Sequence, residues 1–130
     1  MNQPSDTRFH LNKLFFLNRK HTINFVDMCE RFRELCRNGN LDEIKQILNS
    51  HTVDIHADDE EGFRNACRSG NVNLVKSILE YAISINSPIN IHANYDNGFT
   101  NACESGNIDM VKFLLDYVES IDSPFDIHFP

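Results

Sequence analysis

The chain has 130 residues and a formal net charge of −7, from 19 acidic and 12 basic side chains. An acidic protein is not drawn to phosphate backbones or anionic lipid, so we expect no nucleic-acid partner and no membrane partner. The first residues carry charges and only a short apolar run at 14–17, so they predict neither a secretory leader nor a membrane span.

The four cysteines indicate in which cellular compartment the protein resides. Cys36, Cys67 and Cys103 recur at one position of a repeated motif, and Cys29 lies seven residues before Cys36 on one predicted helix. That spacing is about 10 Å along a helix, so it is not a disulfide framework. Buried free thiols are typical of a reducing compartment, and we therefore expect an intracellular, cytoplasmic protein.

The N-terminal segment, residues 1–31, is predicted to contain an amphipathic helix that is capped by Ser5 or Asp6 and covers one end of the molecule. Its sequence KLFFLNRKHTIN resembles KQILNSHTVD at 45–54, which indicates a degenerate half repeat. An unrelated amphipathic helix is an equally good interpretation.

One motif then occurs three times, and it organises the rest of the chain. Its copies are FRELCRNGNLDEIKQIL from Phe32, FRNACRSGNVNLVKSIL from Phe63 and FTNACESGNIDMVKFLL from Phe99, at spacings of 31 and 36 residues. Self-similarity at this period indicates a stack of supersecondary units in which each unit packs on its neighbours. We place the repeats at 32–62, 63–98 and 99–130.

Each repeat is predicted to be a helix, a tight turn and a second helix. Phe63, Ala66 and Cys67 have the i, i+3, i+4 spacing of one apolar helix face. Gly70 can take the left-handed conformation that ends a helix, and Asn71 is a good N-cap for the next one. The other two copies have the same residue types at these glycine and asparagine positions.

The repeats also differ in predictable ways. Glu43 lies three residues after Asn40, the spacing of a capping box. The second helices of the later repeats are predicted to run more than a turn longer than the first and to end at Ser87-Pro88 and Ser123-Pro124. Short polar loops, DDEEG and NYDNG, lead into the next repeat.

These motifs resemble the ankyrin repeats. ACRSGNVNLVKSIL from Ala66 is similar to that family's Ala-Ala-x-x-Gly-His-x-x-Val-Val-x-x-Leu-Leu, and DIHA at 54–57 is similar to its Asp-Val-Asn-Ala. The family's Thr-Pro-Leu-His is replaced by EGFR at 61–64 and NGFT at 97–100. The loop is also about three residues short, so a tight turn is expected in place of the usual β-hairpin.

The resemblance implies an all-α solenoid that binds a protein partner and has no catalytic activity. The shortened loop looks like that of the ankyrin proteins of large DNA viruses of amoebae, which would place the protein in a host cell.

The histidines and cysteines could suggest a metal or redox site. His56, His92 and His128 share one repeat position, but stacked helical units are about 8–10 Å apart. Metal ligands must converge at about 2–2.3 Å on one ion. We therefore interpret the histidines as loop braces and the cysteines as core, and expect no metal, no cofactor and no catalytic residue. A metal-binding or redox protein is the alternative from another class.

The most informative charged residues are arginines on the first helices. Arg33 and Arg37 form an i, i+4 pair that Arg64 and Arg68 repeat in the next unit. Stacking is expected to align them into a positive stripe that suits an acidic peptide or surface. The alternative is that carboxylates of the adjacent loop neutralise the stripe from within: Asp58, Asp59, Glu60 and Glu61.

The resemblance also implies where a partner binds. In the family the first helices and loops form a concave groove, and Arg37, Arg68 and Glu104 fall at its variable positions. Together with the other arginines and the loop residues Tyr95 and Asp96, these are the predicted partner-binding residues.

Two further interaction surfaces follow from the ends of the chain. An adaptor that recruits through its N-terminal apolar helix is the alternative function, with Phe9, Leu14, Phe15 and Phe16 as anchors. At the other end, the apolar stripe from Val111 to Ile121 has no following repeat, which suggests weak self-association.

Overall fold

The computed structural model describes residues 25–50 and 53–125. These contain six α-helices and no strand: α2 (Phe25–Asn38), α3 (Leu41–Ser50), α4 (Ala57–Ser69), α5 (Val72–Ser84), α6 (Ala93–Ser105) and α7 (Ile108–Ser120). The predicted N-terminal helix with its anchors Phe9, Leu14, Phe15 and Phe16 lies outside the described residues, as does His128.

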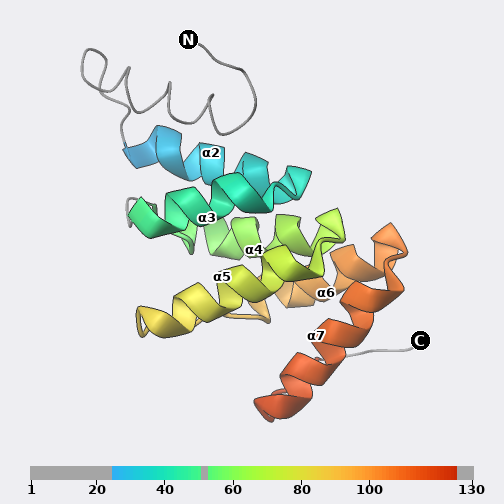
Figure 1. The fold of residues 1–130 in the computed structure, drawn as a ribbon. Coiled ribbons are helices and arrows are strands. Elements are labelled where there is room, and N and C mark those ends of the chain that lie inside the picture. Colours follow the sequence, from blue (N-terminus) through green and yellow to red (C-terminus); the bar gives the residue numbers. More distant parts are fainter. Residues whose placement is uncertain (1–24, 51–52, 126–130) are drawn as a thin grey trace, which may run out of the picture.

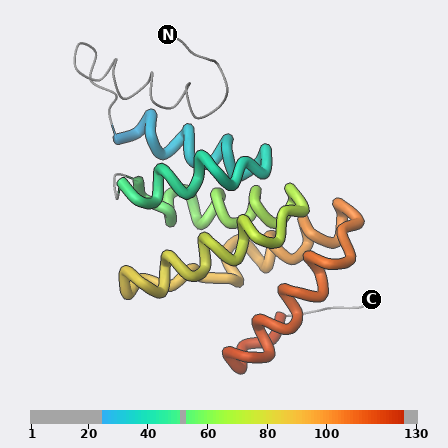
Figure 2. Tube along the Cα trace, in the orientation of Figure 1, coloured from blue at the N-terminus to red at the C-terminus, as the bar shows by residue number. Residues whose placement is uncertain are grey.

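The helices form three antiparallel pairs that follow one another along a stack, from α2–α3 to α6–α7 (Figure 1). The first helices carry most of the contact between layers, because α4 packs on α2 on one side and on α6 on the other. The second helices turn progressively from α3 through α5 to α7, so the stack twists (Figure 2). The predicted all-α repeat solenoid is confirmed.

The turn inside each pair has the predicted chemistry. Gly39, Gly70 and Gly106 have φ of 72°, 80° and 74°, so each ends its first helix in the left-handed conformation that glycine adopts without strain. The side-chain oxygen of Asn71 accepts a hydrogen bond from Leu74 N at 3.1 Å, and Asn107 caps α7 in the same way.

The predicted capping box is confirmed in one half and wrong in the other. The backbone amide of Glu43 donates to Oδ1 of Asn40 at 3.4 Å, as predicted. Glu43 does not accept from the backbone amide of Asn40, which instead donates to the carbonyl oxygen of Leu35. The carboxylate of Glu43 is fully buried and accepts from the side-chain amide of Asn40 at 2.9 Å and from Arg31 at 3.0 Å. A buried carboxylate needs such partners, and Arg31 supplies the compensating charge.

The unequal repeat spacing comes in large part from the longer second helices, as predicted, but these helices are longer by less than the predicted turn. α5 and α7 have 13 residues and α3 has 10, so the later helices are three residues longer, slightly less than one turn. Much of the remaining length forms a turn after each long helix. Asn86 and Asp122 have φ of 58° and 54° in these turns.

In each pair of successive layers, a phenylalanine ring of one layer packs directly against a glycine of the next. A Cβ added at Gly62 would overlap the ring of Phe32, and one at Gly98 would lie 2.8 Å from Cε2 of Phe63. Both rings are almost completely buried. The glycine that replaces the family's proline is therefore required by the ring of the preceding layer, which approaches the backbone directly.

Candidate functional site

The predicted tight turn lies within the first residues of α4 and α6, which are not in the right-handed helical conformation. Asp58, Asp59 and Glu60 have φ of 57°, 59° and 63°, and the equivalent residues Asn94, Tyr95 and Asp96 have almost the same values. Three successive left-handed residues are costly without glycine, so surrounding contacts must hold them in place.

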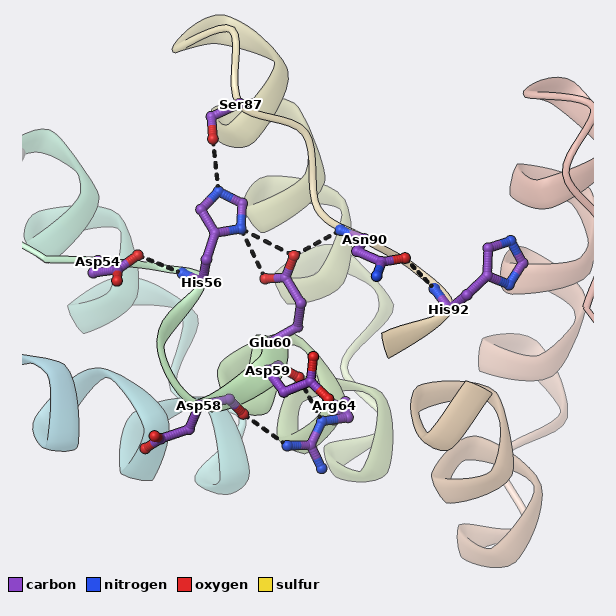
Figure 3. A network of polar contacts seen from close by, with 9 residues as sticks. All are labelled: Asp54, His56, Asp58, Asp59, Glu60, Arg64, Ser87, Asn90 and His92. Carbon is purple, nitrogen blue, oxygen red and sulfur yellow. Dashed lines mark hydrogen bonds and ion pairs between the residues drawn. The ribbon is translucent and has the colours of Figure 1, made fainter. Parts of the chain in front are cut away.

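One set of these contacts is centred on His56 (Figure 3). Nδ1 of His56 lies 2.9 Å from both carboxylate oxygens of Glu60, and Nε2 lies 2.9 Å from Oγ of Ser87. Glu60 also accepts from the backbone amide of Asn90 at 2.6 Å, and Asp54 accepts from that of His56. Because an ionised carboxylate only accepts, Nδ1 is the donor, and Nε2 is within hydrogen-bonding distance of the serine hydroxyl.

The next layer repeats the arrangement. His92 lies 2.6 Å from Asp96 through Nδ1 and 2.7 Å from Ser123 through Nε2. The two layers are joined by Asn90, whose side-chain oxygen accepts from the backbone amide of His92. His56 and His92 are thus loop braces, as predicted.

The role of the serines was not predicted from the sequence. The signal that could have found them is a constant spacing, since Ser87 follows His56 by 31 residues and Ser123 follows His92 by 31. In the sequence alone, these serines indicate only the ends of helices before proline.

A carboxylate, a histidine and a serine in this order resemble the nucleophilic triad of a hydrolase. An oxyanion next to such a nucleophile is usually stabilised by backbone donors, and the two described backbone positions at this serine offer none. The amide of Ser87 donates to the carbonyl oxygen of Ala82 at 2.9 Å, and Pro88 has no amide hydrogen. The arrangement is therefore explained as a brace that holds the loop to the end of α5.

Two of the predicted binding arginines hold the stack. Arg33 forms ion pairs with Asp58 at 3.2 Å and Glu61 at 3.1 Å, and its side chain is only 16% exposed. For Arg33, this confirms the alternative that carboxylates of the adjacent loop neutralise the arginine within the stack. Arg64 donates to the carbonyl oxygens of Asp58 and Asp59 and to the side chain of Asn97, so it fixes the left-handed turn to the next layer.

The positions one turn later face solvent. Arg68 and Glu104 form an ion pair at 2.9 Å across α4 and α6, with side chains 50% and 59% exposed, and Arg68 also donates to Asn101. Arg37 is exposed and makes no hydrogen bond or ion pair within residues 25–50 and 53–125. We call Arg37, Arg68 and Glu104 the outer row, because they occupy equivalent positions on three stacked helices.

The two loop residues predicted to bind a partner lie in opposite environments. Tyr95 is 97% exposed at the tip of its turn. Asp96 is buried and its carboxylate is directed to His92. Only Tyr95 of this pair is therefore placed where a partner can contact it.

The cysteines are only in part the core that the sequence predicts. Cys29, Cys36 and Cys67 are buried, but Cys103 is exposed, so its placement in the core is wrong. Burial raises the pKa of Cys36 and Cys67 well above the usual range, and for Cys36 the proximity of Cys67 adds to this effect. In the described part of the chain, no three His, Cys, Asp or Glu side chains are arranged to hold a metal ion.

Helix pairs that stack through Phe–Gly contacts and are braced by histidines define a helical repeat protein. The chain belongs to the ankyrin-repeat family, because a family model described as ankyrin repeats, three copies, matches residues 33–124. Proteins of this family are generally non-catalytic protein–protein interaction modules.

The other two comparisons, with curated proteins and with solved structures, found no match to the chain. Among the helices described here, none is both long enough and apolar enough to cross a bilayer.

Proposed function

We propose that the chain is a non-catalytic protein-binding module whose partner contacts the outer row and Tyr95 in the groove formed by the first helices and loops. The observation that carries the proposal is a division between equivalent arginines. Arg33 and Arg64 are engaged within the stack, whereas Arg37 and Arg68 one turn later reach solvent. Side chains that the fold leaves exposed are the ones available to a partner.

The outer row favours a particular partner chemistry. Arg37 has an open guanidinium, which binds a carboxylate in a bidentate manner. The Arg68–Glu104 pair neutralises itself, so it presents both a donor and an acceptor and no net charge. The acidic-peptide hypothesis is thereby narrowed to a partner with a carboxylate opposite Arg37 and mixed polar groups opposite the pair.

Tyr95 supplies an aromatic anchor. Tyrosine is enriched among residues that dominate binding energy, because its rigid ring buries a large area at little entropic cost. Its backbone has φ of 58°, which is rare for a bulky residue, and the same strain recurs in the loop of the preceding layer. The loop therefore directs the side chain of Tyr95 outward, where a partner can reach it.

We further propose that the protein acts inside the cell in a reducing compartment, since buried free thiols support this environment. The resemblance of its short loop to ankyrin proteins of large DNA viruses makes a host cytoplasm the setting to test. Antibody staining of infected and uninfected amoebae is the direct test of that setting.

Affinity capture from a host lysate tests the binding surface. The bait is the full chain, compared with a variant that carries Arg37→Glu and Arg68→Glu. We expect partners of the wild type to be lost in the variant, because both changes place a carboxylate where the partner's own carboxylate or polar groups would lie.

A matched control carries Lys45→Glu and Lys112→Glu, two exposed lysines on the second helices, and has the same change in net charge. Circular dichroism of all three proteins checks that they are folded. Loss of the same partners in both variants would indicate a general charge effect. Retention of every partner in the first variant would show that the outer row is not the binding surface.

A further inference from the structure

The second helices of the first two layers enclose a pocket. α3 and α5 pack side by side (Figure 1), and a hollow of about 340 Å³ lies between them. Its lining includes Lys45, Leu48 and Asn49 of α3 and Ser77, Glu80 and Tyr81 of α5. We call it the α3–α5 pocket. Its volume is at the small end of the range for ligand pockets, which is about 300–1000 Å³.

In the next layer, an aromatic ring of the protein itself occupies the equivalent place between α5 and α7. Phe113 has the repeat position of Ser77. Nζ of Lys76 lies 5.5 Å from the centroid of the Phe113 ring, which is the distance of a cation–π contact. The ring of Tyr117 is also close, with its centroid 6.2 Å from that of Phe113. A lysine of one layer and a tyrosine of the next thus hold the phenylalanine ring.

The α3–α5 pocket keeps this lysine and this tyrosine but has a small residue in place of the phenylalanine. Lys45 and Tyr81 occupy the repeat positions of Lys76 and Tyr117, and both line the pocket. Serine at position 77 leaves open the space that the ring of Phe113 fills in the next layer. The protein's own packing therefore indicates which chemical group fits the pocket.

The electrostatics of the pocket are complementary to an aromatic ring. Lys45 is exposed, so its ammonium group can lie over the negative face of a bound ring, as that of Lys76 does. Leu48 offers an apolar surface from α3. Asn49 and Glu80 are exposed beside these residues and can accept hydrogen bonds from backbone amides that flank the ring. These acceptors favour an aromatic residue within a polypeptide over a free aromatic molecule.

We propose that the α3–α5 pocket binds an aromatic side chain of a partner protein, with Lys45 over its ring and Tyr81 beside it. The pocket is formed by second helices, whereas the outer row lies on first helices, so this site is separate from the surface proposed above. The Lys45→Glu and Lys112→Glu variant removes the cation of the pocket. In the affinity capture, a partner lost only from that variant is therefore one that uses the pocket.

The test is a titration of the full chain, followed by the NMR shifts of its backbone amides. The probes are three peptides, Gly-Ser-X-Ser-Gly with blocked ends, in which X is phenylalanine, cyclohexylalanine or alanine. Cyclohexylalanine is apolar and similar in size to phenylalanine but has no π face. A fourth probe, N-acetylphenylalaninamide, carries the aromatic ring without the flanking peptide.

We expect the phenylalanine peptide to shift the amides of Leu48, Ser77 and Tyr81 in a saturable way, and the alanine peptide to leave them unchanged. The cyclohexylalanine peptide should bind about two- to fivefold more weakly, because it lacks the cation–π contact. N-acetylphenylalaninamide should bind about fivefold more weakly, because it lacks the flanking hydrogen bonds.

Three variants locate the binding. Ser77→Phe should abolish the shifts, because its ring fills the pocket as Phe113 does in the next layer, where the fold accepts it. Asn73→Phe is the matched control at an exposed position of the same helix and should keep them. Lys45→Gln, which changes only an exposed side chain, should weaken binding of the phenylalanine peptide about two- to fivefold and leave the cyclohexylalanine peptide unaffected.

Four results would overturn the proposal. No shift with the phenylalanine peptide would show that the pocket is not a binding site, and shifts that persist in Ser77→Phe would place the binding elsewhere. Equal affinity for the phenylalanine and cyclohexylalanine peptides would contradict selection of an aromatic ring. Equal affinity for the phenylalanine peptide and N-acetylphenylalaninamide would identify a free aromatic molecule as the ligand instead of a protein segment.

Discussion

The side chain of Asn71 bonds to two layers at once. Its oxygen caps α5 by accepting from Leu74 N at 3.1 Å, and its amide nitrogen donates to the carbonyl oxygen of Gly39 in the preceding layer at 3.0 Å. Asn107 does the same for α7 and Gly70. The Gly-Asn pair of the repeat thus encodes both the turn within a layer and the bond between layers.

Substituting Asn71 separates these two contributions. Asn71→Ala should lower the free energy of unfolding by about 2 kcal/mol, since it removes the cap and leaves the glycine carbonyl without its donor. Asn71→Asp keeps the capping oxygen and loses only the donor, so about 1 kcal/mol is expected. Urea denaturation measures both, and equal losses would show that the interlayer bond alone carries the effect.

Adding a methyl group at Gly62 should destabilise the stack. Gly62→Ala forces Cβ against the ring of Phe32, and overpacking of this kind costs about 1–3 kcal/mol. Gly106→Ala is the control, because its Cβ enters open space and only the left-handed backbone is strained, at about 1 kcal/mol. If thermal unfolding showed a larger loss of stability for Gly106→Ala than for Gly62→Ala, the Phe–Gly contact would not be what limits the size of the residue at position 62.

The His56 brace predicts coupling between residues far apart in the sequence. In a double-mutant cycle, His56→Ala and Ser87→Ala should each lower stability, and the double variant should lose less than their sum by about 1 kcal/mol. The reason is that either single change removes the same hydrogen bond. Strict additivity in urea denaturation would show that the 2.9 Å contact contributes nothing.

Thiol reactivity follows from burial. One of the four cysteines, Cys103, should react rapidly with Ellman's reagent at pH 8, and the rest only after unfolding. The raised pKa of Cys36 and Cys67 keeps them protonated and unreactive in the folded chain. Fast reaction of two or more thiols in native buffer would contradict this packing.

The same thiols make stability depend on pH. Their pKa is raised on folding, so their contribution is complete below the unfolded value of about 8.5 and is lost as pH rises above it. Between pH 8.5 and 10, the free energy of unfolding should fall by up to about 1.4 kcal/mol per pH unit for each thiol. Cys67→Ala should reduce this slope by half, and an unchanged slope would assign it to other groups.

The fold could be predicted from the sequence because local signals and the repeat agree. Gly70 and Asn71 specify a turn by their own conformational preferences, and the spacing of Phe63, Ala66 and Cys67 specifies a helix face. Three copies of the pattern then leave little choice of architecture.

The site was less predictable, because it depends on which neighbour each charge meets. Arg33 and Arg37 have the same residue type and lie one turn apart, yet only Arg33 is within reach of Asp58 and Glu61. Cys103 matches Cys67 in the sequence but is exposed, because no helix pair of the described residues covers it. From the sequence, Asp96 looks like an exposed loop residue. Its burial and its bond to His92 are seen only in the structure.

Urea denaturation of two double variants is the most direct test of the central claim. The claim is that Arg33 and Arg64 hold the stack, while the arginines of the outer row remain available to a partner. Arg33→Gln with Arg64→Gln removes two ion pairs and the donors to the left-handed turn, and should cost about 2 kcal/mol or more. Arg37→Gln with Arg68→Gln removes an exposed ion pair and one hydrogen bond to Asn101, and should cost less, about 1 kcal/mol. Equal losses, or a larger loss in the second variant, would contradict the claim.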